Sequence, residues 1–450
     1  MKKNGTENIM YHAIIINTIM GVKYQMLDIN YILNNVDKVK ANVEARNMQC
    51  DVDAVIAAHA ALTSLRTQND NLRERMNQNQ KKIRSAANAE ERNAIIAAGQ
   101  EMKKQLQEIS DELRKAEATY TELMYTVPNM MAEDTPLGKN EDLNVEVDHF
   151  LEPTKFSFEP LDHIELGKRL DLIDFEAGAK VAGQKFYYLK NELVLLDLAI
   201  QMYCFNKLIA KGFTPLVTPD MAKADILRGS GFNPRGGERN IYNIEGMDLN
   251  LIATAEITIG GMLAGRTFTE AELPMKYCAL SHCFRTEAGA AGRAGYGLYR
   301  VHQFTKVEMY QFTTNEGGED ALQELLAIEK EIFRDLKIPY RVIRICSGDM
   351  GAPAYKKYDL EAWMPGKGEG GEWGEVTSVG NFTNYQSRRL NIKYVDKDGK
   401  KQFINTLNGT ASATGRTMLA IMENYQQEDG SILIPDVLVP YMNGITIISR

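Results

Sequence analysis

Two arginines and two carboxylates lie close together in this chain, around one glycine-rich turn. Arg285 and Glu287 belong to the run FRTEAG, and Arg300 and Glu308 belong to the following run GLYRVHQFTKVEM. A guanidinium can hold phosphate or carboxylate oxygens in a bidentate fork, and a carboxylate can accept a hydrogen bond from an amine. These residue types therefore predict a nucleotide-binding site.

An antiparallel hairpin would position these side chains. Residues 278–284 (CALSHCF) are apolar enough for a buried strand, and residues 301–312 alternate as a return strand should. Side chains an even number of positions apart on a strand share a face, so we expect Arg285 to point with Glu287, and Arg300 with Glu308. Cross-strand ion pairs on a solvated hairpin would use the same residues, and for an arbitrary protein that is the simpler interpretation.

The segment resembles motif 2 of the class II aminoacyl-tRNA synthetases, in the form found in seryl-tRNA synthetases. Further segments resemble other parts of that family, in the expected order. They are motif 1 at 212–221 (GFTPLVTPDM), the serine-binding loop at 254–256 (TAE), the ATP-and-metal strand at 375–378 (EVTS) with 381–390 (NFTNYQSRRL) after it, and motif 3 at 407–426. The resemblance extends from about Met26 to near the C-terminus. One such motif would be weak evidence, but five in order are strong.

The resemblance implies an α+β fold: the class II synthetase antiparallel sheet flanked by helices, preceded by a long antiparallel helical hairpin. The sequence also has helical patterns at 193–211 and 321–336 and strand candidates joined by tight turns. These features favour the same arrangement of an antiparallel sheet with flanking helices. The chain has neither a P-loop nor a GxGxxG after a first strand, so a parallel doubly wound sheet is not predicted.

Residues 53–126 contain almost no glycine or proline and have a heptad-like apolar spacing. Two seams, separated by a polar break near 85–93, predict an antiparallel helical hairpin. They are Val55, Ala58, Leu62, Leu65, Asn69, Leu72, Met76, Asn79 and Ile83, then Ile95, Gly99, Met102, Leu106, Ile109, Leu113, Ala116, Tyr120 and Leu123. Helices of roughly 35 residues would make a rod of about 50 Å, too long to be buried in a globular core.

Periodicity alone favours a dimerisation or spacer role for this arm. The basic residues at its tip, Lys81, Lys82, Arg84 and Arg92, could contact phosphates, although clusters of this size are usually solvated surface. The family resemblance implies that the arm grips the long variable arm of tRNA through shape and backbone, without reading the anticodon.

Composition sets limits on the other possibilities. A chain of 450 residues with 44% hydrophobic and 25% charged residues should form two or more globular domains. A net charge of −8 argues against broad binding to DNA or to anionic membranes. Five scattered cysteines predict reduced thiols, and no stretch approaches the roughly 18 apolar residues that cross a bilayer. We therefore expect a cytoplasmic protein with no membrane or DNA partner.

Four segments follow from these patterns. Residues 1–25 are expected to be an N-terminal extension that is either disordered or not translated, because the apolar run 9–22 is interrupted by His12 and Asn17 and lacks a cleavage site. Residues 26–130 form the tRNA-binding domain with its arm at 53–126, residues 131–153 a connector, and residues 154–450 the catalytic domain.

The resemblance implies a serine–tRNA ligase that uses ATP and Mg²⁺, forms seryl-adenylate and transfers serine to the 3′ end of tRNA(Ser), with tRNA(Sec) open as a second acceptor. It also implies a homodimer formed through motif 1. Catalytic roles are carried over to Arg285, on the α-phosphate, and to Arg416, on a distal phosphate. ATP binding is carried over to Arg285, Thr286, Glu287, Val301, Glu375, Val376, Thr377, Ser378 and Arg416, and Mg²⁺ binding to Glu375 and Ser378. Serine binding is carried over to Thr254, Ala255, Glu256, Arg285, Glu308, Asn408 and Thr410.

Plainer roles exist for several of these residues: Thr254 could cap a helix, Glu308 could lie on a strand surface and Asn408 could shape a turn. The chain also departs from the family pattern at Gly295-Tyr296-Gly297, in the motif 2 loop, and at Val379-Gly380. The first departure leaves open a paralogue that passes its adenylate to a carrier or small molecule instead of tRNA. A noncatalytic RNA-binding protein on the same fold is the third interpretation.

Overall fold

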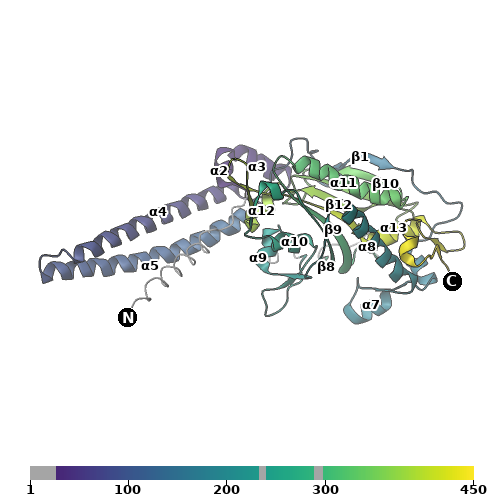
Figure 1. Cartoon of the computed structure of the whole chain (residues 1–450), viewed down its shortest axis with the longest axis horizontal. Helices are drawn as coiled ribbons and strands as arrows, with labels where there is room; N and C mark the ends of the chain where they lie inside the picture. Colours follow the sequence, from purple (N-terminus) through teal and green to yellow (C-terminus); the bar gives the residue numbers. More distant parts are fainter. Residues whose placement is uncertain (1–26, 233–239, 288–296) are drawn as a thin grey trace. The chain divides into compact units, whose positions relative to one another are not determined.

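The computed structural model describes residues 27–232, 240–287 and 297–450. The chain divides into two compact units, residues 25–128 and residues 129–450 (Figure 1). The expected N-terminal extension, residues 1–25, lies outside the described residues. We call the two parts the N-terminal unit and, after the role that the family resemblance implies, the catalytic unit.

The N-terminal unit is a helical hairpin attached to two short helices. Its elements are α2 (Ile29–Asn34), α3 (Val36–Ala45), α4 (Val52–Ile83) and α5 (Ala89–Thr126). The predicted arm is confirmed, and its turn is shorter than the predicted polar break because Asn88 caps α5: the Asn88 side chain accepts a hydrogen bond from the Glu91 amide at 2.8 Å. The 32 residues of α4 span about 48 Å at ~1.5 Å per residue.

The seam of the arm follows the predicted spacing. Val55, Leu62, Asn69 and Leu72 of α4 are buried. Pairs across the hairpin fix its register: the Arg66 guanidinium lies 3.3 Å from Glu117, and the Asn79 side chain donates to the Ile95 carbonyl at 2.9 Å. The Cβ of a non-glycine residue at position 99 would lie 3.0 Å from the Asn79 amide nitrogen, so Gly99 lets the helices approach closely there.

An eight-stranded sheet forms the centre of the catalytic unit. Its order is β1 (Val145–Phe150), β10 (Tyr340–Arg344), β11 (Lys356–Met364), β12 (Glu372–Asn381), β15 (Asn405–Ala413), β9 (Gln303–Thr313), β8 (Met275–Phe284) and β4 (Thr214–Val217). Neighbouring strands are antiparallel except for β4, which pairs in parallel with β8 at the edge. The predicted α+β class with an antiparallel sheet is confirmed.

Helices cover both faces of this sheet. On one face α8 (Glu192–Ala210), α11 (Gly318–Asp335) and α13 (Thr414–Asn424) enclose the main hydrophobic core with alternate residues of the strands, such as Val307 and Met309 of β9. Near the other face lie α9 (Ala224–Gly229), α10 (Glu256–Met262) and α12 (Tyr385–Leu390), which pack on each other (Figure 1). The helices predicted at 193–211 and 321–336 correspond to α8 and α11.

Smaller elements complete the catalytic unit. They are η1 (Glu141–Leu143), α6 (His163–Arg169), β2 (Ile173–Asp174), α7 (Phe175–Ala182), β3 (Tyr188–Leu189), β5 (Met221–Ala222), β6 (Asn250–Leu251), β7 (Thr267–Thr269), η2 (Glu270–Glu272), β13 (Lys393–Val395), β14 (Lys401–Phe403), β16 (Ile432–Leu433), η4 (Val439–Met442) and β17 (Ile447–Ile448). The segment 131–153, expected as a connector, contains β1. It belongs to the catalytic unit because β1 pairs along its length with β10.

Among the described residues, one helix is long and apolar enough to cross a membrane by length and composition: α8. This helix contributes Leu193, Leu196, Ile200 and Leu208 to the main core. A core helix of a folded domain satisfies the same two criteria, and α8 is a helix of this kind.

Candidate active site

A cavity of about 340 Å³ lies on the sheet face opposite the main core. Strands β9, β12 and β15, the described residues just after β8 and just before β9, and the start of α13 all contribute to its lining. Its charged residues are five basic and four acidic: Arg285, Arg300, Lys306, Lys357 and Arg416, with Glu256, Glu287, Glu308 and Glu375. This volume lies within the range of about 300–1,000 Å³ that is usual for ligand pockets.

The structure brings together most of the residues predicted to bind ATP or serine. The cavity is lined by Arg285, Glu287, Val301, Glu375, Val376, Thr377, Ser378 and Arg416 from the ATP set, and by Thr254, Glu256, Glu308, Asn408 and Thr410 from the serine set. Thr286 and Ala255 are not among the lining residues. Ala255 is fully buried in a separate hydrophobic cluster, and the Thr286 amide donates to the Asn240 carbonyl at 3.4 Å.

The hairpin that carries motif 2 is confirmed, with β8 ending where predicted and β9 beginning two residues later than predicted. β8 ends at Phe284 and β9 begins at Gln303, so Arg285, Glu287 and Arg300 lie outside the strands. Strand alternation therefore does not position Arg285 and Glu287, because Glu287 adopts a left-handed φ of 47° that takes the chain out of extended geometry, yet Arg285, Glu287, Arg300 and Glu308 all line the cavity. Arg300 and Glu287 instead form an ion pair at 3.0 Å.

Arg285 is held from two sides at the end of β8. Its guanidinium carbon lies 5.2 Å from the centroid of the Phe304 ring, and one guanidinium nitrogen is 3.5 Å from the Ala253 carbonyl. Its backbone is also fixed, because the Arg285 amide donates to the His302 carbonyl at 3.0 Å. These contacts leave most of the guanidinium donors free for an anionic ligand.

Arg416 enters the cavity from the first turn of α13. Its guanidinium donates to the Glu375 carbonyl at 2.8 Å, pairs with the Glu375 carboxylate at 3.1 Å and stacks on Tyr299 at 4.5 Å. Burial opposes ionisation of Glu375, but the charges of Arg416 and Lys357 outweigh it and lower the pKa of this carboxyl group to about 2. Glu375 is therefore a carboxylate at neutral pH.

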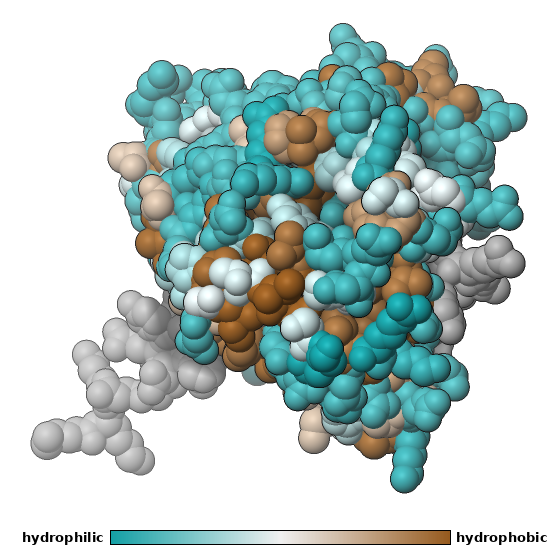
Figure 2. All heavy atoms as spheres, turned by 90° about the vertical axis from the view of Figure 1, so that its right-hand side faces the viewer, coloured by the Kyte–Doolittle hydropathy of each residue, from teal (hydrophilic) through white to brown (hydrophobic). Residues whose placement is uncertain are grey.

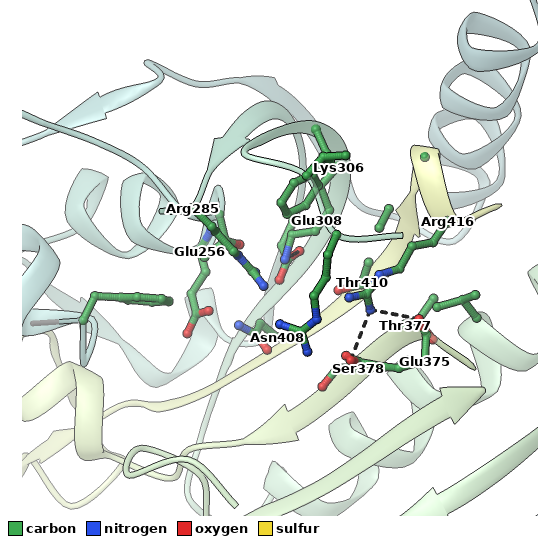
Figure 3. Close-up of a pocket in the computed structure, with 18 of the residues that line it drawn as sticks. Glu256, Arg285, Lys306, Glu308, Glu375, Thr377, Ser378, Asn408, Thr410 and Arg416 are labelled. Carbon is green, nitrogen blue, oxygen red and sulfur yellow. Dashed lines mark hydrogen bonds and ion pairs between the residues drawn. The ribbon is translucent and has the colours of Figure 1, made fainter. Parts of the chain in front are cut away.

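A bulge in β12 explains how residues three positions apart reach the same cavity. Leu360 of β11 pairs with Thr377, whereas the next residue, Glu361, pairs with Glu375, so β12 contains one extra residue at this point. In a regular strand, Glu375 and Ser378 would face opposite sides of the sheet. With the bulge, both line the cavity (Figure 3).

Glu308 and Thr410 are direct neighbours across β9 and β15. Glu308 is 1% exposed and forms an ion pair with Lys306, two positions away on the same face of β9. Burial raises the pKa of Glu308, while Lys306 and Arg285 lower it. The alternative of a surface strand position for Glu308 is therefore excluded.

The structure also bears on the plainer roles of Asn408 and Thr254. Asn408 lies within β15 opposite Tyr310, so it does not shape a turn. The Thr254 hydroxyl accepts a hydrogen bond from the Glu256 amide at 3.3 Å at the start of α10, and Thr254 also lines the cavity. The N-cap residue of α10 is Ala255, so Thr254 is not the helix cap.

The departures from the family pattern lie in different surroundings. Val379 is fully buried in the main core, on the side of β12 away from the cavity, whereas a Cβ at Gly380, the position of the missing hydroxyl, would lie 3.0 Å from the Phe382 ring. Of Gly295, Tyr296 and Gly297, only Gly297 is among the described residues. Its φ is 67°, and a Cβ there would lie 2.0 Å from the His163 ring, so glycine is required at this position.

Phe304, Lys306 and Lys357 line the cavity but were not predicted as site residues. Phe304 and Lys306 alternate with Glu308 along β9, so the even spacing used for Arg300 and Glu308 would have identified them. Lys357 could not be found this way, because its position depends on the pairing of β11 with β12.

Figure 3 shows how these side chains divide the cavity. Glu256 and Asn408 lie at one end, and Glu375 and Arg416 at the other, with Thr410 between them. One end therefore presents carboxylate and amide groups, and the other presents a guanidinium and an ionised carboxylate.

Comparison with known proteins identifies the family of this chain. A model described as the seryl-tRNA synthetase N-terminal domain matches residues 26–131, and the tRNA synthetase class II core domain (G, H, P, S and T) matches residues 242–425. A serine–tRNA ligase of Treponema denticola is 51% identical over 416 residues, which cover 92% of this chain and 98% of that protein. The chain belongs to the seryl-tRNA synthetase family.

Solved structures agree with this assignment. The seryl-tRNA synthetase of Pyrococcus horikoshii, complexed with ATP, has a TM-score of 0.85 and 35% identity, covering 94% of this chain and 100% of that one. The cytoplasmic serine–tRNA ligase of Naegleria fowleri, in complex with AMP, has a TM-score of 0.80 and 31% identity, covering 95% and 99% of the two chains.

Proposed function

We propose that this protein is a serine–tRNA ligase that forms seryl-adenylate from serine and ATP and then transfers the seryl group to tRNA(Ser). The observation that carries the proposal is the single cavity in which Glu256, Glu308 and Thr410 are joined to Arg285 and Arg416. The two carboxylates can bind the ammonium group of serine, Thr410 can form a hydrogen bond with its hydroxyl, and the two arginines can bind the phosphates of ATP.

In the first step, a serine carboxylate oxygen attacks the α-phosphorus of ATP, and pyrophosphate leaves with the electrons of the broken P–O bond. Arg285 neutralises the charge that develops on the α-phosphate, and Arg416 that on a distal phosphate. Glu287 accepts from the adenine amino group, and Phe304 offers an aromatic face beside Arg285. In the second step, a terminal ribose hydroxyl of tRNA attacks the seryl carbonyl, and AMP leaves.

Glu375 and Ser378 fit Mg²⁺ as oxygen ligands, because the bulge in β12 turns both toward the cavity and Glu375 is ionised. Held by these residues, the ion would neutralise charge on the phosphates of ATP.

The proposal is tested by serine-dependent ATP–pyrophosphate exchange, followed by charging of tRNA(Ser) and tRNA(Sec) with labelled serine. Exchange together with charging of tRNA(Ser) is the expected result. Exchange without any charging would indicate a ligase that uses a carrier or small molecule, and absence of both would overturn the enzymatic proposal.

Glu308→Ala should reduce serine-dependent exchange by about 10²-fold or more, since a buried carboxylate that meets an ammonium group contributes about 3 kcal/mol. ATP binding, measured by calorimetry, should remain within twofold of wild type. Glu372→Ala, on an exposed residue of β12, is the control. Wild-type exchange in Glu308→Ala would remove Glu308 from the serine site.

We further propose a homodimer through motif 1, supported by an apolar surface around α8 and the edge strand β4. The exposed apolar residues there are Val194, Leu198, Met202, Ile209, Val217 and Met221, with Val217 at 85%. Figure 2 shows apolar side chains gathered on a face of the catalytic unit. Unpaired edge strands and apolar patches are usually covered in stable proteins.

Val217→Asp should convert the dimer into a monomer at micromolar concentration. In a two-fold symmetric interface both subunits contribute the same surface, so each dimer would have to bury two of the introduced carboxylates. Sedimentation velocity measures this change. Leu137→Asp changes an exposed apolar residue of the catalytic unit outside motif 1, and it should leave the dimer intact. A Val217→Asp dimer as stable as wild type would contradict the proposed interface.

We also propose that residues 26–130 bind tRNA and that residues 154–450 form the catalytic domain. The cytoplasm is the proposed compartment, in agreement with five cysteines that are all free thiols.

A further inference from the structure

Gln386 of α12 is fully buried beside the cavity, and its side-chain amide forms four hydrogen bonds. The amide nitrogen donates to the Ser230 carbonyl at 3.1 Å and to the Glu256 carboxylate. The amide oxygen accepts from the Tyr310 hydroxyl at 2.6 Å and from the Thr406 hydroxyl at 2.8 Å. A primary amide has two N–H donors and an oxygen with two lone pairs, so its capacity is fully used.

These partners allow only one orientation of the amide. The Ser230 carbonyl can only accept, so the amide nitrogen must face it, and the second N–H then points at Glu256. The flipped amide would place its oxygen against a carbonyl and a carboxylate, leaving buried acceptors without donors. Burial raises the pKa of Tyr310 well above its ordinary value, so this residue remains a hydroxyl donor.

Glu256 needs such a donor because its surroundings oppose its negative charge. Burial and the neighbouring Glu308 carboxylate raise the pKa of Glu256 to about 7, while Lys306, Gln386 and Asn408 act in the opposite direction. The charged or titratable groups that face it are Glu308, Lys306 and Tyr310, all on β9. A hydrogen bond donated to a carboxylate favours the ionised form.

We infer that Gln386, oriented by Tyr310 and Thr406, is a positioning residue that holds the Glu256 carboxylate in place for the ammonium group of serine. The inference rests on the proposed function, because it concerns the amino-acid end of the same site. Gln386 does not line the cavity, so it acts on serine only through Glu256.

Gln386→Met keeps an unbranched side chain of similar size but removes all four hydrogen bonds. We expect the KM for serine in ATP–pyrophosphate exchange to rise at least tenfold at pH 8, with the KM for ATP within twofold of wild type. The acidic limb of kcat/KM for serine should move to higher pH by about one unit, because an N–H donor to the carboxylate is lost.

Two further variants keep the test informative if Gln386→Met fails to fold. Tyr310→Phe removes one hydroxyl donor to the Gln386 oxygen without changing the shape of the ring, and it should cause a smaller shift in the same direction. Gln426→Met is the matched control. Gln426 is also buried and forms three amide hydrogen bonds, to the amide and carbonyl of Leu161 and to the Glu423 carbonyl, but it does not line the cavity.

A wild-type serine KM and pH profile in folded Gln386→Met and Tyr310→Phe would overturn the inference, as would an equal rise in the KM values for serine and ATP. Absence of serine-dependent exchange in the wild-type protein would instead overturn the proposed function, and the inference with it.

Discussion

Replacing Arg285 by alanine is expected to reduce kcat/KM for serine-dependent ATP–pyrophosphate exchange by about 10³-fold, or about 4 kcal/mol of transition-state stabilisation. The α-phosphate gains charge as the serine oxygen attacks, and a guanidinium fixed beforehand stabilises that charge without reorganising. Arg285 is fixed in this way by the Phe304 ring and the Ala253 carbonyl. Most of the loss should therefore appear in kcat.

A lysine at position 285 would keep the positive charge but not the planar fork. Arg285→Lys should recover only part of the rate, about tenfold, because bidentate contact is lost. Arg266→Ala is the control, since Arg266 also stacks on a phenylalanine, Phe268 at 4.7 Å, and does not line the cavity. A loss in Arg266→Ala as large as that in Arg285→Ala would attribute the effect to general destabilisation.

Residue spacing predicted the architecture more accurately than it predicted the details of the site. The heptad seams predicted the arm because each seam residue has its partner on the neighbouring helix of the same hairpin. The apolar run at 278–284 and the alternation at 301–312 predicted the β8–β9 pair for a similar reason. These patterns are local, so a single sequence contains them.

The positions of Arg285 and Glu287 depend on where a strand ends, and periodicity does not specify this. The left-handed conformation at Glu287 turns the chain at a residue type for which such a φ is uncommon. The bulges in β12 and β15 are similar cases: one lies between Glu375 and Thr377, and the other separates Thr410 from Ser412. Each changes which side chains face the cavity, and each depends on pairing between distant segments.

Residue spacing also could not predict the role of Gln386. Its four partners come from residues 230, 256, 310 and 406, which only the folded catalytic unit brings together. A sequence shows which residue types could accept or donate, whereas the orientation of a buried amide follows from the partners around it.

Shortening the helical arm should separate the two steps of the reaction. A variant in which a short glycine-rich loop replaces residues 73–108 keeps the Arg66–Glu117 and His59–Tyr120 contacts near the base of the hairpin. Charging of tRNA(Ser) should fall by about 10²-fold or more, since several phosphate contacts would be lost. Exchange of ATP with pyrophosphate should stay within twofold, because the cavity is lined only by residues of the catalytic unit.

The salt dependence of charging gives a second measurement on the same variant. Because binding releases counterions, the logarithm of the association constant falls linearly with the logarithm of the salt concentration. The slope is set by the number of phosphates contacted. Lys81, Lys82, Arg84 and Arg92 are all exposed at the tip of the arm, so its removal should reduce this slope. Sedimentation should still give a dimer, because the proposed dimer surface lies in the catalytic unit. Loss of the dimer with unchanged charging at saturating protein would instead assign the arm to assembly, the role that its periodicity alone favours.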